Sequence, residues 1–302
     1  DRPMARRYIP SEPTSRLAIW ARRMAVFALL ASLLAIGFVR WSPFEEIRPA
    51  LATFAGALAI AVVALLLAFA AFVVIWVEGL KGIGAALSAM AISLALLAYP
   101  AYLGIKAYRL PWIYDITTDP IDPPRYEALA RLRGRDANPI TYPGLYSADQ
   151  QRIAYPDIGP LGTNASPQAA YDAALAVVNK RKDSFAAPYW RLIDARPPLP
   201  GRREGRIEAI VYSSVMGLRD DVVIRVRAEG DGARIDVRSS SRYGSFDFGT
   251  NAGRVRRLMN DIEDAIRTQK PERPPPTPPA FGKKKTPLVK KDRSKGDAQR
   301  AR

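Results

Sequence analysis

Cysteine and histidine are both absent from this sequence of 302 residues. Without cysteine there is no disulfide, no thiolate nucleophile and no cysteine-ligated zinc or iron–sulfur site. Without histidine there is no imidazole base, no Ser-His-Asp triad and no histidine-ligated metal. The two absences exclude the active sites of most familiar hydrolases and oxidoreductases, and the sequence predicts no cofactor.

The residues that are present are unevenly distributed. Lysine and arginine outnumber aspartate and glutamate by 45 to 29, which gives a formal net charge of +16, and hydrophobic residues make up 48% of the chain. The hydrophobic residues are concentrated in the first third, in uncharged segments at residues 24–39, 49–77 and 82–105. This distribution is not that of two globular cores.

The lengths of these segments are those of membrane spans. A bilayer core about 30 Å thick requires roughly 20 apolar residues of helix, so the second and third segments are long enough. The first is shorter, and it crosses if Ala21 or Trp41 lies at the interface and the neighbouring arginines reach the headgroups. A cleaved signal peptide is the alternative for this segment alone. We predict a three-helix transmembrane region at residues 24–105.

The spans carry no ionisable residue between their ends, whereas transporters and channels place such residues along their path. We therefore expect an anchor that contacts membrane lipids, and small residues along the spans allow a homo-oligomer. Six basic residues precede the first span and Lys81 follows the second, against five basic residues near the opposite ends. The positive-inside rule predicts a cytoplasmic N-terminal segment at residues 1–23 and a periplasmic domain of a bacterial inner-membrane protein.

Proline and tyrosine dominate the predicted connector at residues 106–165. Prolines at positions 111, 120, 123 and 124 exclude a helix at residues 111–124. Asp115, Asp119 and Asp122 offer oxygen ligands for a hard cation, but Asx turns explain the same residues and we predict no metal site. The stretch at 138–164 is expected to form loops that wrap a core.

Residues 166–270 have the pattern of an α+β domain. Ser166 and Pro167 are typical of a helix start, and a second helix runs to about Gln269 with Thr250 or Asn251 as its cap. Between the helices lie four strand-like runs, at residues 189–195, 206–214, 222–228 and 233–242. The predicted fold class is three transmembrane α-helices followed by an α+β domain of order α-β-β-β-β-α, an antiparallel sheet with two helices on one face.

The predicted strands alternate with a period of two. One face is apolar, and the other carries Arg206, Glu208, Arg225, Arg227, Arg234, Asp236 and Arg238. We expect this second face to be open to water and to be the candidate surface for an anionic group. Cross-strand pairing of arginines with carboxylates on that solvated face is the alternative, and it is the favoured interpretation. Asp220 and Asp221 would point to opposite faces of a strand, and a turn capped by aspartate is the preferred interpretation.

The last segment, at residues 271–302, contains ten basic and three acidic residues and is rich in proline. Its composition predicts a disordered tail. No aromatic platform or helix-turn-helix accompanies it, so nucleic acid is not an expected partner. Anionic lipid, lipopolysaccharide or an acidic protein is the expected contact outside the cytoplasm.

A set of short motifs appears in order along the second half of the chain. They are DITTDP (115–120), PP (123–124), NP (138–139), YPDI (155–158), RIEA (206–209), DDVVIRVR (220–227), DVRSSSRYG (236–244) and NAGRVRRL (251–258). In this set the sequence from about residue 111 to 269 resembles the bacterial family called domain of unknown function 1499, in its membrane-anchored branch. The resemblance implies a fold and an envelope setting and no activity.

The motif residues that the resemblance suggests for a functional surface come from several predicted elements. They are Asp115, Thr117, Asp119, Tyr155, Asp157, Asp221, Arg238, Ser241, Arg242, Asp247, Asn251 and Arg254, to which the sheet pattern adds Arg225 and Arg227. The alternative is that the polar members form a buried network that fixes the loops to the sheet. No catalytic residue is predicted.

Three functions remain open. The favoured one is a non-enzymatic inner-membrane protein whose periplasmic domain binds a partner protein or a component of the cell envelope. The second is a lipid- or small-ligand-binding domain with a pocket between sheet and helices or under the Tyr-rich loops. The third is a hydrolase that uses carboxylates alone.

Overall fold

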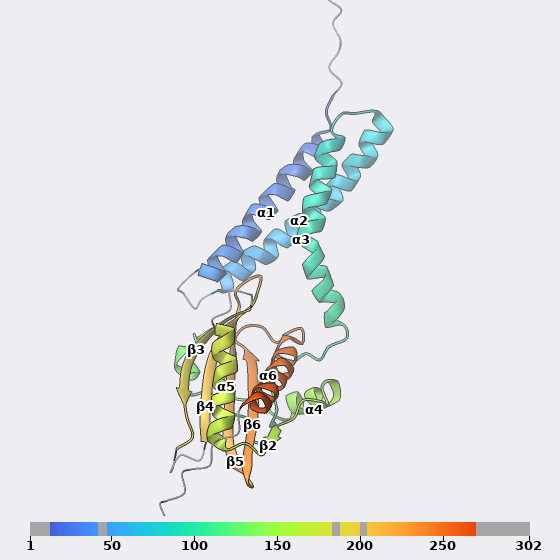
Figure 1. Cartoon of the computed structure of the whole chain (residues 1–302). Helices are drawn as coiled ribbons and strands as arrows, with labels where there is room; N and C mark the ends of the chain where they lie inside the picture. The colour runs from blue at the N-terminus through green and yellow to red at the C-terminus, as the bar shows by residue number, and fades with distance from the viewer. Residues whose placement is uncertain (1–12, 42–46, 183–187, 200–203, 270–302) are drawn as a thin grey trace, which may run out of the picture. The chain divides into compact units, whose positions relative to one another are not determined.

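The computed structural model describes residues 13–41, 47–182, 188–199 and 204–269. The predicted tail at 271–302 and most of the predicted N-terminal segment lie outside the described residues. Figure 1 shows helices α1 to α3, followed along the chain by a mixed domain of strands and helices.

The first three helices are long and apolar enough to cross a membrane, so three apolar helices are confirmed where the spans were predicted. They are α1 (Arg16–Trp41), α2 (Arg48–Glu78) and α3 (Ile83–Ala107). The helix α1 begins before the apolar run and has 26 residues, so it is about 39 Å long at 1.5 Å per residue. The three helices contact one another through buried alanines such as Ala21, Ala64 and Ala89, small residues that allow close approach in lipid.

The domain contains a six-stranded antiparallel sheet of order β1-β6-β5-β4-β3, with β2 also paired to β6. The strands are β1 (Asp115–Thr117), β2 (Leu161–Thr163), β3 (Tyr189–Arg196), β4 (Glu204–Tyr212), β5 (Arg219–Glu229) and β6 (Gly232–Ser241). The α+β class and the four long strands are confirmed. The short strands β1 and β2 were not predicted, and both come from the connector.

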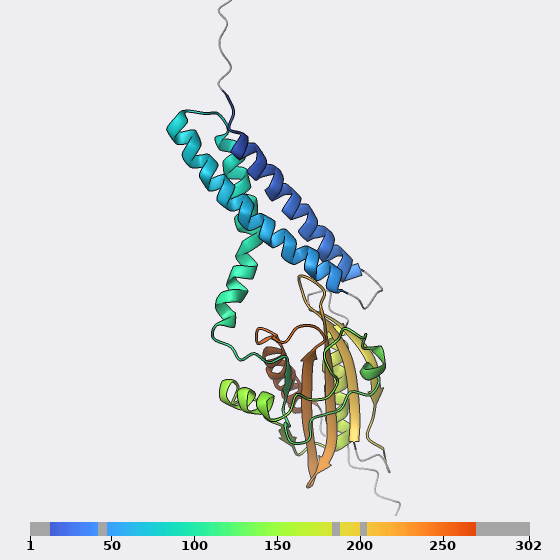
Figure 2. The same cartoon turned by 180° about the vertical axis from the view of Figure 1, so that it is seen from behind.

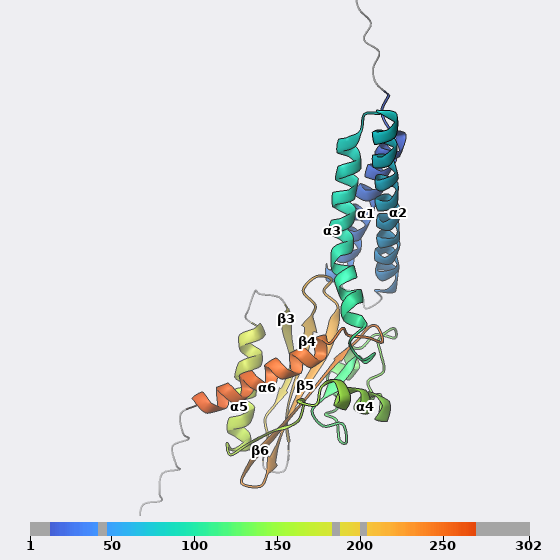
Figure 3. The same ribbon diagram turned by 90° about the vertical axis from the view of Figure 1, so that its right-hand side faces the viewer.

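Helices α5 (Pro167–Lys182) and α6 (Thr250–Thr268) cover one face of the sheet, as predicted. Figure 3 shows the two helices crossing on the same side of the strands. The core between them is closed by apolar side chains such as Val178, Ile224 and Leu258, each fully buried. This packing fills the space directly over the central strands, while an open hollow of about 570 Å³ lies between α5 and α6, lined by residues such as Val177, Asp261 and Ala265.

The starts of these two helices differ in how they are capped. The amide of Ala169 donates to the Ser166 hydroxyl at 3.2 Å, so the predicted cap of α5 is confirmed. The prediction for α6 is wrong, because Gly249 occupies the N-cap position and the Asp247 side chain, two residues earlier, supplies the acceptor. Its carboxylate accepts the amides of Gly249 and Asn251, both at 2.8 Å, and the left-handed backbone of Gly249 (φ 72°) turns the chain toward that carboxylate.

The expectation of loops at 138–164 is also corrected. This stretch contains helix α4 (Leu145–Ala154), which begins after Gly144 without a side-chain cap. The Gln151 side chain pairs with the backbone of Thr117, accepting its amide at 3.0 Å and donating to its carbonyl at 2.7 Å. The amide group thereby occupies the free edge of β1, as a neighbouring strand would.

The second face of the sheet is covered, and the expectation of a face open to water is wrong. The segment from residue 118 to 142, with the short 3-10 helix η1 (Leu129–Leu132), passes over it, as seen from behind in Figure 2. Tyr126 and Leu129 of this segment pack on Ile210 and Val223 of the sheet. The charged side chains of Glu208, Asp236 and Arg238 are consequently buried.

Candidate functional site

The covered face holds a compact group of charges that we call the Asp119 cluster. It consists of Asp119, Asp122, Arg225, Arg227, Arg234 and Asp236. Strands β5 and β6 supply four of these residues, since residues two apart in a strand share a face. The two remaining aspartates lie just beyond β1, where the Thr118 amide donates to the Val237 carbonyl and the Val237 amide donates to the Thr118 hydroxyl, both at 2.9 Å.

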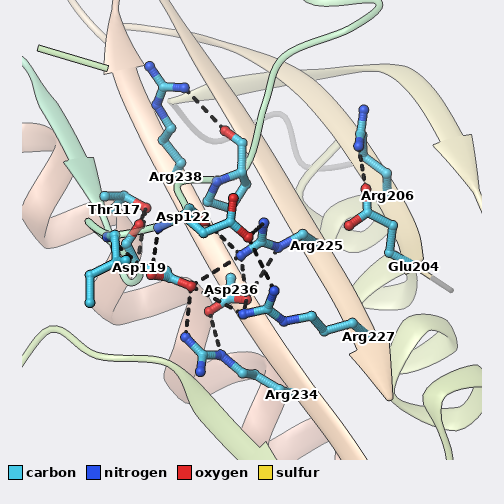
Figure 4. Close-up of polar contacts among 12 residues, drawn as sticks. Thr117, Asp119, Asp122, Glu204, Arg206, Arg225, Arg227, Arg234, Asp236 and Arg238 are labelled. Carbon is cyan, nitrogen blue, oxygen red and sulfur yellow. Dashed lines mark hydrogen bonds and ion pairs between the residues drawn. The ribbon is translucent and has the colours of Figure 1, made fainter. Parts of the chain in front are cut away.

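Within the cluster each carboxylate contacts more than one guanidinium group. Asp119 accepts from Arg234 at 2.9 Å, from Arg227 at 3.2 Å and from Arg225 at 3.3 Å. Asp236, which is fully buried, accepts from Arg225 at 3.0 Å. Figure 4 shows the guanidinium groups converging on these two carboxylates.

The charges of the Asp119 cluster balance. Three carboxylates and three guanidinium groups lie together, and a buried charge is tolerated when it is paired and hydrogen-bonded. The aspartates that the sequence offered to a cation hold arginines instead. The arginines that the sequence suggested for an anionic ligand donate to carboxylates within the domain instead. This face therefore has the predicted Arg–carboxylate pairing and is not a free anion-binding surface.

A second buried pair joins β6 to β1. Arg238 donates to Asp115 from Nε at 3.0 Å and from Nη2 at 2.7 Å, and it also donates to the carbonyls of Pro124 and Ile140. Burial raises the pKa of the Asp115 carboxyl, while the hydrogen bonds from Arg238 act in the opposite direction. The pair therefore fixes both strand and covering segment.

Two tyrosine rings flank the Arg238 guanidinium. Its carbon lies 4.6 Å from the ring centroid of Tyr126 and 5.7 Å from that of Tyr142, within the range of a cation–π contact. Burial raises the pKa of both phenols far above the ordinary value of 10. Both tyrosines therefore stay neutral at physiological pH.

Asp220 and Asp221 lie within β5, so the interpretation as a turn is wrong and their expected placement on opposite faces is right. Asp221 accepts from Arg133 at 2.7 Å and from Arg242 at 2.9 Å on the covered face. Asp220 accepts from Arg254 of α6 at 2.6 Å on the helix face. The two carboxylates are thus held apart by the sheet.

Two serines of the SSSR run, Ser239 and Ser241, take part in a network with α6, while Ser240 contacts Tyr126 and Arg133 on the covered face. The hydroxyl of Ser239 donates to Asn251 at 2.7 Å and accepts from Arg254 at 2.8 Å. The Asn251 amide donates to the Ser241 hydroxyl at 3.0 Å. These hydrogen bonds join the sheet to α6. The serine, asparagine and arginine side chains therefore have a structural role here.

The sequence-predicted residues therefore fall into separate groups. Most of them lie in the buried pairs and networks just described, in agreement with the alternative of a polar network that fixes the loops. Tyr155 and Asp157 lie apart from these, where Asp157 forms an exposed pair with Arg256 at 2.6 Å and the Arg256 guanidinium stacks on Tyr155. Burial raises the pKa of Tyr155 to about 12. Thr117 faces Asp119, whose amide it accepts at 3.2 Å.

Glu208 is a buried charge that the sequence places on the charged face of the sheet but does not suggest as a site residue. Its carboxylate accepts the amides of Glu127, Ala128 and Leu129 at 2.9, 3.3 and 2.8 Å. These are the free N–H groups at the start of η1, and such groups attract a negative charge. The signal in the sequence was the position of Glu208 on the same strand face as the arginines, where a carboxylate is expected to have a partner.

The covering segment leaves one sizeable hollow, the Tyr126–Tyr142 pocket, with a volume of about 550 Å³. Ligand sites of small molecules have comparable volumes. Its lining residues are Pro120, Ile121, Asp122, Pro123, Arg125, Tyr126, Ile140, Thr141, Tyr142 and Arg238. The pocket lies at the start of the Tyr-rich stretch at residues 138–164. The sequence suggested a ligand pocket under these Tyr-rich loops as one alternative.

The polarity of this pocket is mixed. Ile121 at its rim is 98% exposed, and Arg125 is exposed beside it. The hydroxyl of Tyr142 is buried and has no hydrogen-bond partner among the described residues. Asp122 also lines the pocket, but its carboxylate is paired with Arg225 and Arg227. An apolar wall with Arg125 at the rim is suited to a ring or chain that carries an acceptor or an anionic group.

A family model described as "Protein of unknown function (DUF1499)" matches residues 115–262, from the first residue of β1 into α6. No curated protein matches the chain. The matched region includes β1 and the segment that covers the sheet, so both buried charge groups and the Tyr126–Tyr142 pocket lie within it.

Proposed function

Since residues 115–262 belong to the DUF1499 family, we propose that this chain anchors a DUF1499 domain to the bacterial inner membrane and that the domain binds an envelope component or partner in the Tyr126–Tyr142 pocket without catalysing a reaction. The N-terminus lies in the cytoplasm and the domain lies in the periplasm, as in the membrane-anchored branch of the family. A lipid or another small ligand in the same pocket is the second candidate.

The orientation rests on the basic residues near the span ends. Arg22 and Arg23 lie in the N-terminal half of α1, and Lys81 lies in the short turn between α2 and α3. These belong to the same side of the membrane, and an excess of basic residues favours the cytoplasmic side. A reporter that is active only outside the cytoplasm, fused to the C-terminus, tests this. Activity of a cytoplasm-only reporter instead would contradict the topology.

The pocket is the observation that carries the binding function. The arginines around the Asp119 cluster are neutralised by their partners, whereas the pocket walls present proline, tyrosine and isoleucine side chains to solvent. Rigid rings of this kind bind the flat faces of sugars, apolar chains or peptide side chains with little loss of side-chain entropy. Arg125 at the rim favours a ligand that is neutral or anionic over a cation.

Carboxylate-only catalysis has less support. The nearest arrangement is a small cleft that contains Glu127 and Glu204 with Arg196 and Arg206. Desolvation raises the pKa of Glu127, but the hydrogen bonds and charges of Arg206 and Arg196 outweigh it and lower the pKa overall. A general acid needs a raised pKa, so this pair is suited to an ion-pair network.

Photocrosslinking from the pocket rim tests the proposal in the intact membrane. A photoreactive amino acid replaces Ile121 at the rim, and in a matched control it replaces Leu145 on α4, which is 85% exposed and does not line the pocket. We expect an adduct of defined mass from position 121 only. A small mass increment identifies a lipid or small ligand, and a protein-sized one identifies a partner. Equal adducts from both positions would reject the pocket as the site.

A further inference from the structure

The connection between the third helix and the domain is very short. Helix α3 ends at Ala107, and Leu110 already packs on the apolar core of the domain. The carbonyl of Ile113 accepts the amide of Asp247 at 3.2 Å, so the chain is bonded to the α6 end of the domain from that point on. Tyr108 and Arg109 are therefore the whole tether.

The tether is also folded. The amide of Arg109 donates to Lys106 at 3.2 Å and that of Leu110 donates to Ala107 at 3.4 Å, which continues the helix as a turn. The three residue steps from Ala107 to Leu110 span at most roughly 10 Å when the chain is extended, and a turn spans less. The edge of the domain that holds Leu110 therefore lies within the depth of the headgroup layer from the end of α3.

That edge carries an aromatic cluster made of Trp112, Phe246 and Phe248. The rings of Trp112 and Phe246 stack at 5.2 Å, and those of Phe246 and Phe248 lie 4.4 Å apart. Trp112 is 64% exposed although it is the largest side chain type. Phe248 has a left-handed backbone (φ 53°), an unfavourable state for a bulky residue that places its ring against Phe246.

The end of α3 has the composition of a membrane interface. Tyr99, Tyr102 and Tyr108 are all more than half exposed, and tyrosine and tryptophan gather at the level of the headgroups. Lys106 and Arg109 add positive charge at the same end, which complements anionic headgroups. The aromatic cluster follows this belt directly along the chain.

We propose that the Trp112–Phe246–Phe248 cluster inserts into the interfacial layer of the membrane that α3 crosses. The cluster contacts the lipid surface because the short tether keeps this edge of the domain close to the membrane. The aromatic and basic side chains also continue the interfacial belt on α3. The insertion fixes the orientation of the domain on the membrane. It depends on α3 as a span and not on the Tyr126–Tyr142 pocket or on which side the domain lies.

Spin labelling tests the insertion in the full chain, which has no native cysteine. Ser245→Cys places a label on the exposed residue next to Phe246, and Asp231→Cys places one on the exposed turn at the opposite end of β6. The protein is studied in nanodiscs of phosphatidylethanolamine and phosphatidylglycerol. Collision with oxygen, which concentrates in lipid, is compared with collision with a water-soluble nickel chelate.

We expect the label at position 245 to have an oxygen-to-nickel collision ratio several-fold above that at position 231. Phe246→Ser combined with Ser245→Cys is expected to reduce the ratio toward the value in water, while hydrogen exchange of β6 stays unchanged. Equal, water-like ratios at both positions would overturn the proposal. A label at 245 shielded from both reagents, as in a protein contact, would also overturn it.

Discussion

Arg238 and Asp115 link β6 to β1 through two hydrogen bonds, of 3.0 and 2.7 Å, and both side chains are buried. The first belongs to a long strand that the sequence pattern predicts, and the second belongs to a strand of three residues in the connector. The pair explains how a proline-rich segment becomes part of the sheet. It also places a charge beneath the covering segment, where it must be compensated.

Breaking this pair is expected to destabilise the domain strongly. Arg238→Ala leaves the Asp115 carboxylate buried without its partner, and removing one member of a buried pair costs about 3–5 kcal/mol. Arg238→Lys is expected to recover only part of this, since lysine does not form the bidentate contact. Urea unfolding of the full chain in detergent gives the free energies. Arg152→Ala, which removes an exposed partner of Asp149, is the control and should change stability by less than about 0.5 kcal/mol.

The contact between Gln151 and Thr117 predicts a local effect. Gln151→Ala removes two hydrogen bonds to the β1 backbone and exposes a strand edge, at a cost of about 1–3 kcal/mol. Hydrogen exchange should accelerate in the peptide that contains Thr117, with little change in β4. Gln168→Ala, which removes a contact with Asp172 on the surface of α5, serves as the control. Unchanged exchange at Thr117 would show that the side chain does not protect this edge.

The cap of α6 predicts a third outcome. Asp247→Ala removes the acceptor of the Gly249 and Asn251 amides, and loss of such a cap costs about 0.5–2 kcal/mol. Thr250→Ala changes the residue that the sequence suggested as cap and should cost little, because Thr250 is exposed and lies inside the helix. The stability of each variant is measured by thermal unfolding. Equal losses of stability for the two variants would contradict the assignment of Asp247 as the acceptor.

Tyr126 predicts a loss of stability at alkaline pH. Burial raises the pKa of its phenol, whose hydroxyl donates to the Asp221 carbonyl at 3.2 Å. A group with a raised folded pKa contributes its full stability below the unfolded value of about 10 and loses it as the pH rises toward the folded value. The free energy of unfolding should therefore fall above pH 10, by at most about 1.4 kcal/mol per pH unit for this group. Tyr126→Phe should show a shallower fall, and identical slopes would exclude Tyr126 as the cause.

Much of the fold was predictable because its signals are local. The apolar lengths of α1, α2 and α3 and the period-two pattern of β4, β5 and β6 depend on neighbouring residues. Strands β1 and β2 have three residues each, too few for a pattern. Helix α4 begins directly after Gly144, which has no side chain to cap it, so its start carries no signal.

The site was less predictable because its partners are far apart in the chain. Arg225 and Asp122 are 103 residues apart and bond at 2.9 Å, and no local pattern reports such a pairing. The sequence pattern of alternating arginines and carboxylates is the same for a solvent-exposed face of a sheet and for a covered one. The motif residues did indicate the buried network, since Asp115, Asp221 and Arg242 all belong to it, but the pocket walls at Ile121 and Ile140 had no signal of their own.

The central claim is that the Tyr126–Tyr142 pocket, and not the arginine face, is the binding site. The most direct measurement is the adduct yield from a photoreactive residue at position 121 in two backgrounds. Thr141→Trp fills the pocket without replacing a residue of the Asp119 cluster. Arg227→Gln removes a partly exposed guanidinium of that cluster that does not line the pocket, while Arg225 keeps its bond to Asp122, the residue that the cluster and the pocket lining share. The account predicts loss of the adduct in Thr141→Trp and retention in Arg227→Gln. Retention in Thr141→Trp with loss in Arg227→Gln would contradict it.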